Sequence, residues 1–339
     1  MATIVKRGEK YFAQIRRTGY KSVSRSFETK ALGQEWVRKV EREMDEAKYQ
    51  DIRPIASITL ETLIDRYVTE IGGTEGFGRN KQNVYRSLKK SIGYLKLSEI
   101  TAERLSLFAA DRIASGAGGV TVSIDLTYLK LLFKVASELW NIHIDMKAVT
   151  SAKASLKYKG ISTQGNERTR RPTQSEVTRI IAYFNARSTQ ITPMWDIVPF
   201  AIATAMRLGE IVRIRWEDIN VEDRTVVIRD RKHPREKVGN DHTVPLLGEA
   251  FEIAMRQTKN ASDTRIFPFN GDTISSTFPR AMQALGIHDL RFHDLRHEGV
   301  SRLFEQGYTI EQVSLVSGHR DWSMLRRYVQ LKAKDLHRD

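Results

Sequence analysis

The chain of 339 residues contains no cysteine. Disulfides, zinc sites built on thiolates and a cysteine nucleophile are therefore excluded. The chain also lacks any run of about 18 uncharged apolar residues, the length that a membrane-spanning helix needs. Its first residues, MATIVKRGEKYFAQ, hold no apolar segment of the kind found in secretory signals. We therefore expect no membrane association and a cytoplasmic location.

Acidic residues are also few: 41 Asp and Glu face 55 Lys and Arg, which gives a formal net charge of +14. A balance this basic fits a polyanionic partner, and nucleic acid is the first candidate. Solubility alone also explains the charge of some basic proteins, so this signal does not decide the function. The length suits two or three domains.

Four segments can be distinguished along the chain. The sequence pattern of residues 1–53 predicts a small domain of three short strands and one helix. Residues 57–145 show helical apolar periodicity and predict a helical domain. Residues 146–172 lack that periodicity, are rich in Lys and Arg, and predict a basic linker. Residues 173–339 predict helices with one β-hairpin, so the fold class is mainly α with small β elements.

Three basic features upstream of residue 173 have two interpretations each. The N-terminal sheet, with eight Lys or Arg against two Glu in the first 30 residues, is either a reader of a DNA groove, which we favour, or a solvated face. The linker either crosses a phosphate backbone or only joins two domains. The helix with Lys81, Arg86, Lys89 and Lys90 is either a DNA contact or a solvated face.

Four stretches in the last segment stand out by their order and spacing. They are TAMRLGE at residues 204–210, HDLRH at residues 293–297, SGHR at residues 317–320 and RRY at residues 326–328. Each alone is a weak signal, because a single arginine is usually a surface charge and a single histidine or tyrosine is usually structural. The final tyrosine follows the histidine of SGHR by nine residues.

Together these stretches resemble the signature of the tyrosine site-specific recombinases of the phage integrase family. That family carries an arginine in a T-G-x-R-x-G-E-like stretch, a lysine in a β-hairpin, an H-x-x-R-H stretch, a G-H pair and a nucleophilic tyrosine. The upstream segments resemble the family's helical core-binding domain and the arm-type DNA-binding domain of some integrases. The resemblance implies that residues 173–339 are the catalytic domain.

The resemblance assigns catalysis to Arg207, Lys232, His293, Arg296, His319 and Tyr328. The chemistry agrees with this set, since attack by a tyrosine oxygen on a phosphodiester builds negative charge on a phosphorane. Without a metal, that charge must be met by fixed cations, and arginines give forked hydrogen bonds to the nonbridging oxygens. The product would be a 3′-phosphotyrosine and a free 5′-hydroxyl, so rejoining needs neither ATP nor a cofactor.

Individual roles follow from the same resemblance. His319 would add a third donor to the phosphate. His293 would accept the proton of Tyr328 or hydrogen-bond the phosphate. Lys232 would protonate the leaving 5′-oxygen, and Lys237 in the same hairpin is the alternative.

The sequence departs from the family pattern at two positions. Ala205 stands where glycine is commoner, which puts little in doubt. Ser317 stands where leucine is usual, so the packing near His319 is expected to differ. Glu210 is expected to order Arg207 or its helix, and His297 to support the site or contact the phosphate.

The resemblance also implies partners. These are double-stranded DNA at core and arm sites, a homotetramer that exchanges strands through a Holliday junction, a host DNA-bending protein and an excision factor. The helical and catalytic domains are expected to embrace the core site, and residues 329–339 to dock on a neighbouring protomer.

Three rival functions fit part of this pattern. His293 and His297 have the spacing of a helical zinc pair, but a third ligand is not evident and a metalloprotease would not need the arginines. A type IB topoisomerase shares the chemistry but relaxes DNA without exchange, and the N-terminal module and the short segment after Tyr328 favour recombination. A DNA-binding regulator without catalysis would not need all six residues.

Overall fold

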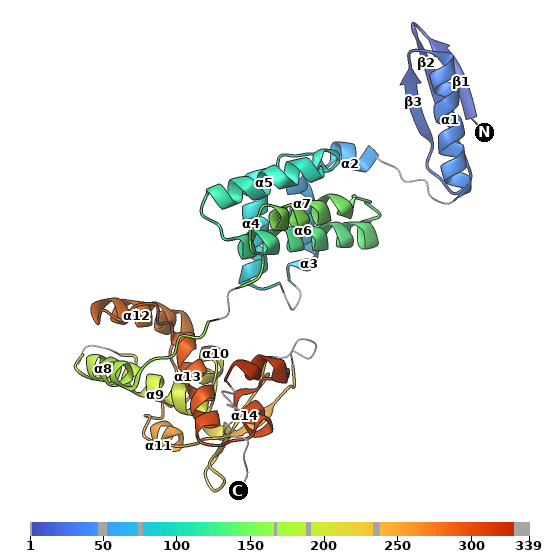
Figure 1. Ribbon diagram of the computed structural model, residues 1–339. Helices are drawn as coiled ribbons and strands as arrows, with labels where there is room; N and C mark the ends of the chain where they lie inside the picture. The colour runs from blue at the N-terminus through green and yellow to red at the C-terminus, as the bar shows by residue number, and fades with distance from the viewer. Residues whose placement is uncertain are drawn as a thin grey trace, which may run out of the picture. The chain divides into compact units, whose positions relative to one another are not determined.

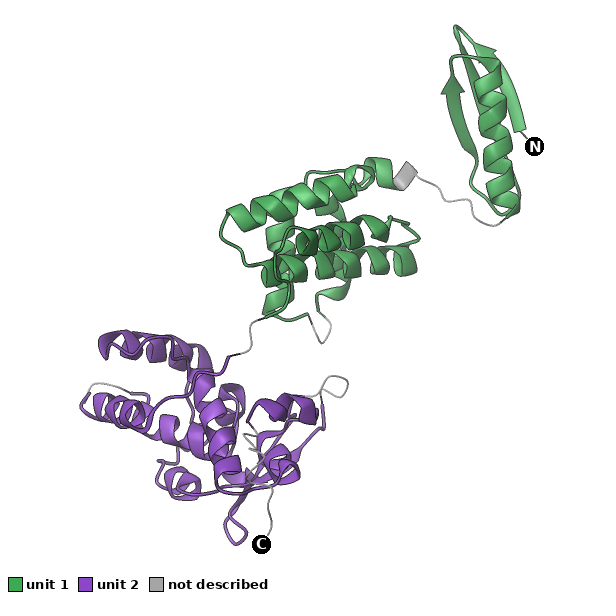
Figure 2. Ribbon diagram, in the orientation of Figure 1, with its two compact units in different colours: residues 1–166 green, residues 167–339 purple. Residues whose placement is uncertain are grey.

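The computed structural model describes residues 2–46, 53–73, 77–165, 168–187, 191–232 and 238–328 (Figure 1). The chain divides into two compact units, Met1–Asn166 and Glu167–Asp339 (Figure 2). In the described part of the chain, no helix has both the length and the apolar character needed to cross a membrane.

The N-terminal sheet predicted from the sequence is present. Strands β1 (Ala2–Arg7), β2 (Lys10–Ile15) and β3 (Val23–Phe27) pair antiparallel in that order. Helix α1 (Lys30–Asp45), capped by the hydroxyl of Thr29, covers the sheet. Their shared core is small and contains Ala13, Ile15, Val23, Val37, Val40 and Met44.

The rest of the first unit is helical. Its elements are α2 (Arg53–Ser57), α3 (Leu60–Ile71), α4 (Arg79–Ile92), the 3₁₀ helix η1 (Leu97–Glu99), α5 (Ala102–Ala114), α6 (Gly119–Trp140) and α7 (Met146–Tyr158). They enclose one apolar core, separate from that of the N-terminal sheet.

Helix α7 corrects the predicted linker, because residues 146–158 belong to the helical domain. Its apolar side chains Ala148, Val149, Ala152 and Leu156 are buried in that core, against α5 and α6. These positions lie on one helical face, while the lysines of the same segment point elsewhere. The connection between the domains is therefore shorter than the charge pattern predicts.

The second unit combines helices with one small sheet. Its helices are α8 (Gln174–Asn185), α9 (Met194–Thr204), α10 (Leu208–Ile211), α11 (Ala250–Met255), α12 (Gly271–Ala284), α13 (Phe292–Glu305) and α14 (Ile310–Ser317), with the 3₁₀ helices η2 (Trp216–Asp218) and η3 (Trp322–Tyr328). The antiparallel sheet has the order β4 (Ile219–Asn220), β5 (Thr225–Ile228) and β6 (His242–Pro245). The predicted mainly helical fold with small sheets is confirmed.

A close helix contact positions the segment that carries the HDLRH stretch. Helix α13 packs on α9, and Gly299 lies where they touch. A Cβ atom on Gly299 would stand 2.2 Å from the carbonyl oxygen of Ile202. Only glycine permits this approach, which brings α13 next to the end of α9.

Candidate active site

The TAMRLGE stretch forms the turn between α9 and α10. Ala205 ends α9 with φ +50°, in the left-handed region, and Arg207 begins α10. The buried carboxylate of Glu210 accepts hydrogen bonds from the backbone N–H of Arg207, at 3.0 Å, and from its Nη1, at 2.8 Å. Glu210 therefore orders Arg207, as the sequence analysis expects. Ala205 occupies a conformation that glycine adopts more easily, which accounts for the commoner family residue.

The pKa of Glu210 is lowered by its cationic surroundings. Burial acts in the opposite direction and raises it, but the charge of Arg231, the backbone N–H of Arg207 and the charges of Arg207 and Arg296 together outweigh burial. Glu210 is therefore ionised at neutral pH.

Arg296 is buried between the ends of two helices. Its guanidinium donates to the carbonyl of Ala205, at the end of α9, and to the carbonyl of Ser317, at the end of α14, the latter at 2.7 Å. Nη2 also lies 3.4 Å from Nε2 of His319. Burial, and then the charge of Arg207, lower the pKa of Arg296. Arg207 and Arg296 thus lie in one cluster.

His319 follows the left-handed Gly318 that ends α14. The buried hydroxyl of Ser317 donates to the carbonyl of Val313 at 2.6 Å and lies 2.7 Å from Nδ1 of His319. Because its single proton is used, the hydroxyl accepts from Nδ1–H, and Nε2 is left as the acceptor that faces Arg296. The leucine-to-serine departure therefore fixes the histidine ring through a hydrogen bond. Burial and the nearby arginines lower the pKa of His319 to about 3.

Tyr328 lies at the end of η3 and contacts His297. Nδ1 of His297 is within hydrogen-bond distance of the Tyr328 hydroxyl, and the two rings are stacked with centroids 5.7 Å apart. His293 instead meets the edge of His297, at 4.9 Å between ring centroids. Of the two histidines, it is thus His297 that contacts the tyrosine oxygen. The sequence analysis gave His293 two possible roles, acceptance of the tyrosine proton or a hydrogen bond to the phosphate.

The pKa values of His293, His297 and Tyr328 all shift in the direction that favours the neutral side chain. Burial and the neighbouring cations lower the pKa of His293, and burial followed by the charges of His293 and Arg327 lowers that of His297 to about 4. Burial raises the pKa of Tyr328, although Arg327 and Arg296 oppose it. Both histidines are therefore neutral at pH 7, and His297 has a lone pair free to accept a proton.

Lys232 follows strand β5 and is exposed. The residue before it, Arg231, is buried and contacts the end of α14. Neither the residue type nor the strand pattern indicated that Arg231 would be internal. The alternative, Lys237, lies outside the described residues.

Three arginines of the predicted basic linker are bound by carboxylates of the second unit. Arg168 pairs with Asp294 at 2.8 Å and Asp289 at 2.9 Å, Arg170 with Glu176, and Arg171 with Glu298 and Glu305. Two of these acids, Asp294 and Glu298, are buried on α13. The segment thus anchors the helix that carries His293, Arg296 and His297, and these three charges are internally compensated.

The zinc alternative gains no support from the donor geometry. Within the described ranges, no group of three or more His, Asp or Glu side chains lies close enough to hold a metal ion. His297 directs Nδ1 to Tyr328.

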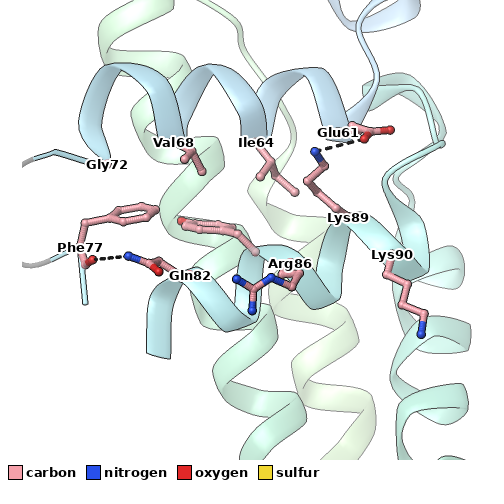
Figure 3. A pocket seen from close by; sticks show the side chains of 10 residues that line it. Glu61, Ile64, Val68, Gly72, Phe77, Gln82, Arg86, Lys89 and Lys90 are labelled. Atoms are coloured by element: carbon pink, nitrogen blue, oxygen red, sulfur yellow. Dashed lines mark hydrogen bonds and ion pairs between the residues drawn. The ribbon is translucent and has the colours of Figure 1, made fainter. Parts of the chain in front are cut away.

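A separate cavity of about 680 Å³ lies between α3 and α4 in the helical domain (Figure 3). Its lining includes the apolar side chains of Ile64 and Phe77 and the basic side chains of Arg86 and Lys90. Lys89, which also lines it, is paired with Glu61 at 3.1 Å and Asp65 at 2.7 Å. Lys89 is one of the four basic residues that the sequence places on this helix, and these two acids compensate its charge.

Comparisons with known proteins agree with the geometry. A model of the phage integrase family matches residues 170–335. An integrase/recombinase of Haemophilus influenzae is 30% identical over 338 residues, covering 96% of this chain and 86% of that protein. A shufflon-specific DNA recombinase of Escherichia coli is 30% identical over 293 residues, covering 83% of this chain and 71% of that protein.

Two solved structures are similar in fold. A lambda integrase tetramer bound to a Holliday junction gives a TM-score of 0.62 at 19% identity, covering 94% of this chain and 95% of that chain. The integrase of transposon Tn1549, in complex with a circular intermediate DNA, gives 0.64 at 14% identity, covering 82% of this chain and 97% of that chain.

Proposed function

The chain belongs to the phage integrase family of tyrosine site-specific recombinases, and we propose that it cleaves and rejoins DNA with Tyr328 as the nucleophile. The observation that carries the proposal is a chain of contacts between these residues. Arg207 and Arg296 both lie near the Glu210 carboxylate, Arg296 contacts His319, and His297 contacts the Tyr328 hydroxyl. These groups come from four separate stretches of sequence. Structural needs alone would not gather them.

The arginines supply the charge stabilisation. A phosphorane carries extra negative charge on its nonbridging oxygens, and preorganised donors stabilise it most in a site with little water. Arg207 is partly exposed and free to turn its remaining N–H groups to the phosphate, while Arg296 is fixed by two carbonyls. His319, with Nε2 beside Arg296, donates once it is protonated next to the phosphate.

The tyrosine proton is proposed to pass to His297. As the Tyr328 oxygen forms its bond to phosphorus, its proton moves to Nδ1 of the neutral His297. The bond from phosphorus to the 5′-oxygen breaks, and Lys232 gives that oxygen a proton. The 3′-phosphotyrosine retains the phosphodiester energy, so the reverse attack by a 5′-hydroxyl rejoins the strand. His293, next to His297, is proposed to contact the phosphate.

A suicide substrate tests the nucleophile. In a core site nicked beside the scissile phosphate, the cleaved fragment diffuses away and a covalent protein–DNA adduct accumulates. The adduct is expected with wild type and absent with Tyr328→Phe. Tyr308→Phe is the matched control, since Tyr308 packs against the same apolar cluster as Tyr328, and it should form the adduct. Persistence of the adduct in Tyr328→Phe would refute the assignment.

The domain roles complete the proposal. The helical and catalytic domains would grip a core site, the N-terminal domain would bind arm sites, and four protomers would exchange strands through a Holliday junction, the state named for the lambda integrase relative. Action on DNA would place the protein in the bacterial cytoplasm. A host DNA-bending protein and an excision factor would set the direction of integration or excision.

The segment after Tyr328 is proposed to couple neighbouring active sites. Residues 329–339 lie outside the described residues. Deleting the residues after Leu331 should weaken strand exchange more than DNA binding. An unchanged recombination rate would count against the coupling.

Recombination and relaxation are separated by one assay. A supercoiled plasmid with two target sites should yield recombinant products, whereas a type IB topoisomerase would only relax it. A regulator without catalysis would do neither.

A further inference from the structure

Arg231 is one of the largest fully buried side chains of the protein, with 2% of its surface exposed. It lies between strand β5 and Lys232, at the base of the hairpin. Burying a guanidinium costs several kcal/mol unless its charge and its donors are compensated. Its contacts show where that compensation comes from.

The guanidinium caps the end of α14. Nη1 donates to the carbonyl of Leu315 at 3.1 Å, and Nη2 donates to the carbonyl of Val316 at 2.7 Å. The last carbonyls of a helix have no partners within the helix and attract positive charge. Gly318 packs on the same group, since a Cβ there would stand 2.4 Å from Cζ of Arg231. His319 directly follows this contact.

The same side chain faces the Glu210 carboxylate. Nε of Arg231 lies 3.5 Å from Oε1 of Glu210, and among the described residues it has no acceptor within hydrogen-bond geometry. Oε1 also accepts from Arg207 at 2.8 Å. One carboxylate oxygen therefore links Arg231 to Arg207.

The backbone of Arg231 is fixed as well. Its N–H donates to the carbonyl of Asn240 at 2.8 Å, and the Asn240 side-chain amide donates back to the carbonyl of Arg231. Nη2 of Arg320 donates to Oδ1 of Asn240 at 2.8 Å. The base of the hairpin is thus tied twice to residues 315–320, once through Arg231 and once through Asn240.

We propose that Arg231 is a positioning residue. It holds the segment between strand β5 and Lys232 against the end of α14, and it thereby places Lys232 at the leaving 5′-oxygen. The inference rests on the proposed role of Lys232. It explains why a cation whose donors face helix carbonyls and Glu210 is buried next to Lys232. It also couples the lysine to His319 and, through Glu210, to Arg207.

Two suicide substrates test the proposal, one with the natural 5′-oxygen at the scissile phosphate and one with sulfur in its place. A thiol has a pKa of about 8.5 and leaves as a thiolate without a proton, so sulfur makes a general acid unnecessary. The variants are Lys232→Ala and Arg231→Met, with Arg224→Met as the control, at the residue directly before strand β5. Arg224 is exposed and pairs at 3.7 Å with Glu252, which is exposed as well.

On the oxygen substrate, Lys232→Ala should lose on the order of 100-fold or more in cleavage rate, as expected for a general acid. Arg231→Met should lose about 10- to 100-fold, as expected for a misplaced catalytic group. On the sulfur substrate, both should return to within about threefold of wild type. Arg224→Met should match wild type on both substrates.

Distinct outcomes separate the possible failures. If Lys232→Ala is restored by sulfur and Arg231→Met is not, Arg231 has only a structural role and the proposal is overturned. If sulfur does not restore Lys232→Ala, the proposed role of Lys232 is wrong, whatever Arg231 does. Should Arg231→Met not fold, Asn240→Ala removes the second tie at a partly exposed position, and it should show a smaller loss that sulfur restores. A loss in Asn240→Ala that persists with sulfur overturns the proposal.

Discussion

The substitution Arg168→Met should destabilise the catalytic unit strongly, although Arg168 is distant in sequence from every catalytic residue. Its guanidinium holds Asp294, whose side chain is 0% exposed, through hydrogen bonds of 3.1 and 2.8 Å. Methionine would leave a buried carboxylate unpaired, at a cost of about 3–5 kcal/mol. For a unit of this size, each kcal/mol corresponds to roughly 2–4 °C, so the unfolding midpoint should fall by roughly 6–20 °C.

Asp289→Asn provides the control. Asp289 binds the same arginine at 2.9 Å, but its side chain is 66% exposed, and an exposed pair contributes about 0–1 kcal/mol. Thermal unfolding of the full chain, with hydrogen exchange of α13 peptides to identify the catalytic unit, measures both variants. Equal midpoints for Arg168→Met and Asp289→Asn would refute the reasoning.

The pH dependence of this cost has a definite sign. Burial raises the pKa of Asp294, but the hydrogen bonds from Arg168 and from the backbone of Arg291 outweigh it, and the net shift is downward. A depressed carboxyl pKa gives stability above the unfolded pKa of about 3.9 that is lost as pH falls through the folded pKa. The difference between wild type and Arg168→Met should therefore be larger at pH 7 than at about pH 3.

Three further predictions concern the site. Lowering the pH from 6.5 towards 4 should reduce the free energy of unfolding, and His297 should contribute up to about 1.4 kcal/mol per pH unit to this loss. The reason is that only the unfolded state binds a proton at this histidine between these pH values. Urea unfolding of His297→Gln should therefore show a shallower pH dependence than wild type. Ser317→Ala should slow cleavage about 10-fold with DNA binding unchanged, since His319 loses the acceptor for Nδ1–H; an unchanged rate would remove the serine from the site. Gly318→Ala should cost more than the roughly 1 kcal/mol of a left-handed alanine, because its Cβ also meets Arg231, and a midpoint equal to wild type would contradict that contact.

Local chemistry made several elements predictable from sequence. Thr173 and Glu176 form the expected capping box of α8, and Gly318 ends α14 in the left-handed conformation. Both depend on neighbours within a few residues, where the sequence states the geometry directly. The residues proposed for catalysis were predicted from their order along the chain. In the structure His293 contacts His297, which contacts Tyr328, and Arg296 contacts His319.

Long-range choices were not predictable. His293 and His297 lie one turn apart on α13, and sequence spacing cannot say which ring meets a tyrosine 31 residues further on. The sequence analysis did not predict the helix over residues 146–158, although its apolar residues have helical spacing. The lysines between them instead suggested a basic linker. The burial of Arg231 left no local signal, since its acceptors are backbone carbonyls more than 80 residues away.

The two groups of arginines in the catalytic unit are compensated in different ways, and the difference bears on function. Arg168, Arg170 and Arg171 each have at least one carboxylate of their own. Around the site, Arg207 and Arg231 share the single carboxylate of Glu210.

Arg296 and Arg231 are otherwise held by carbonyls at helix ends, which fix a guanidinium in place but leave its charge unneutralised. Three arginines with one glutamate leave an excess of positive charge in this cluster. Burial is the larger cause of the lowered pKa values of His297 and His319, and nearby cations add to it. In the proposed mechanism, a phosphodiester that enters the cluster would supply the missing negative charge, and the phosphorane would supply more. The proposed site would then be least compensated without DNA and best compensated in the transition state, the arrangement that electrostatic catalysis requires.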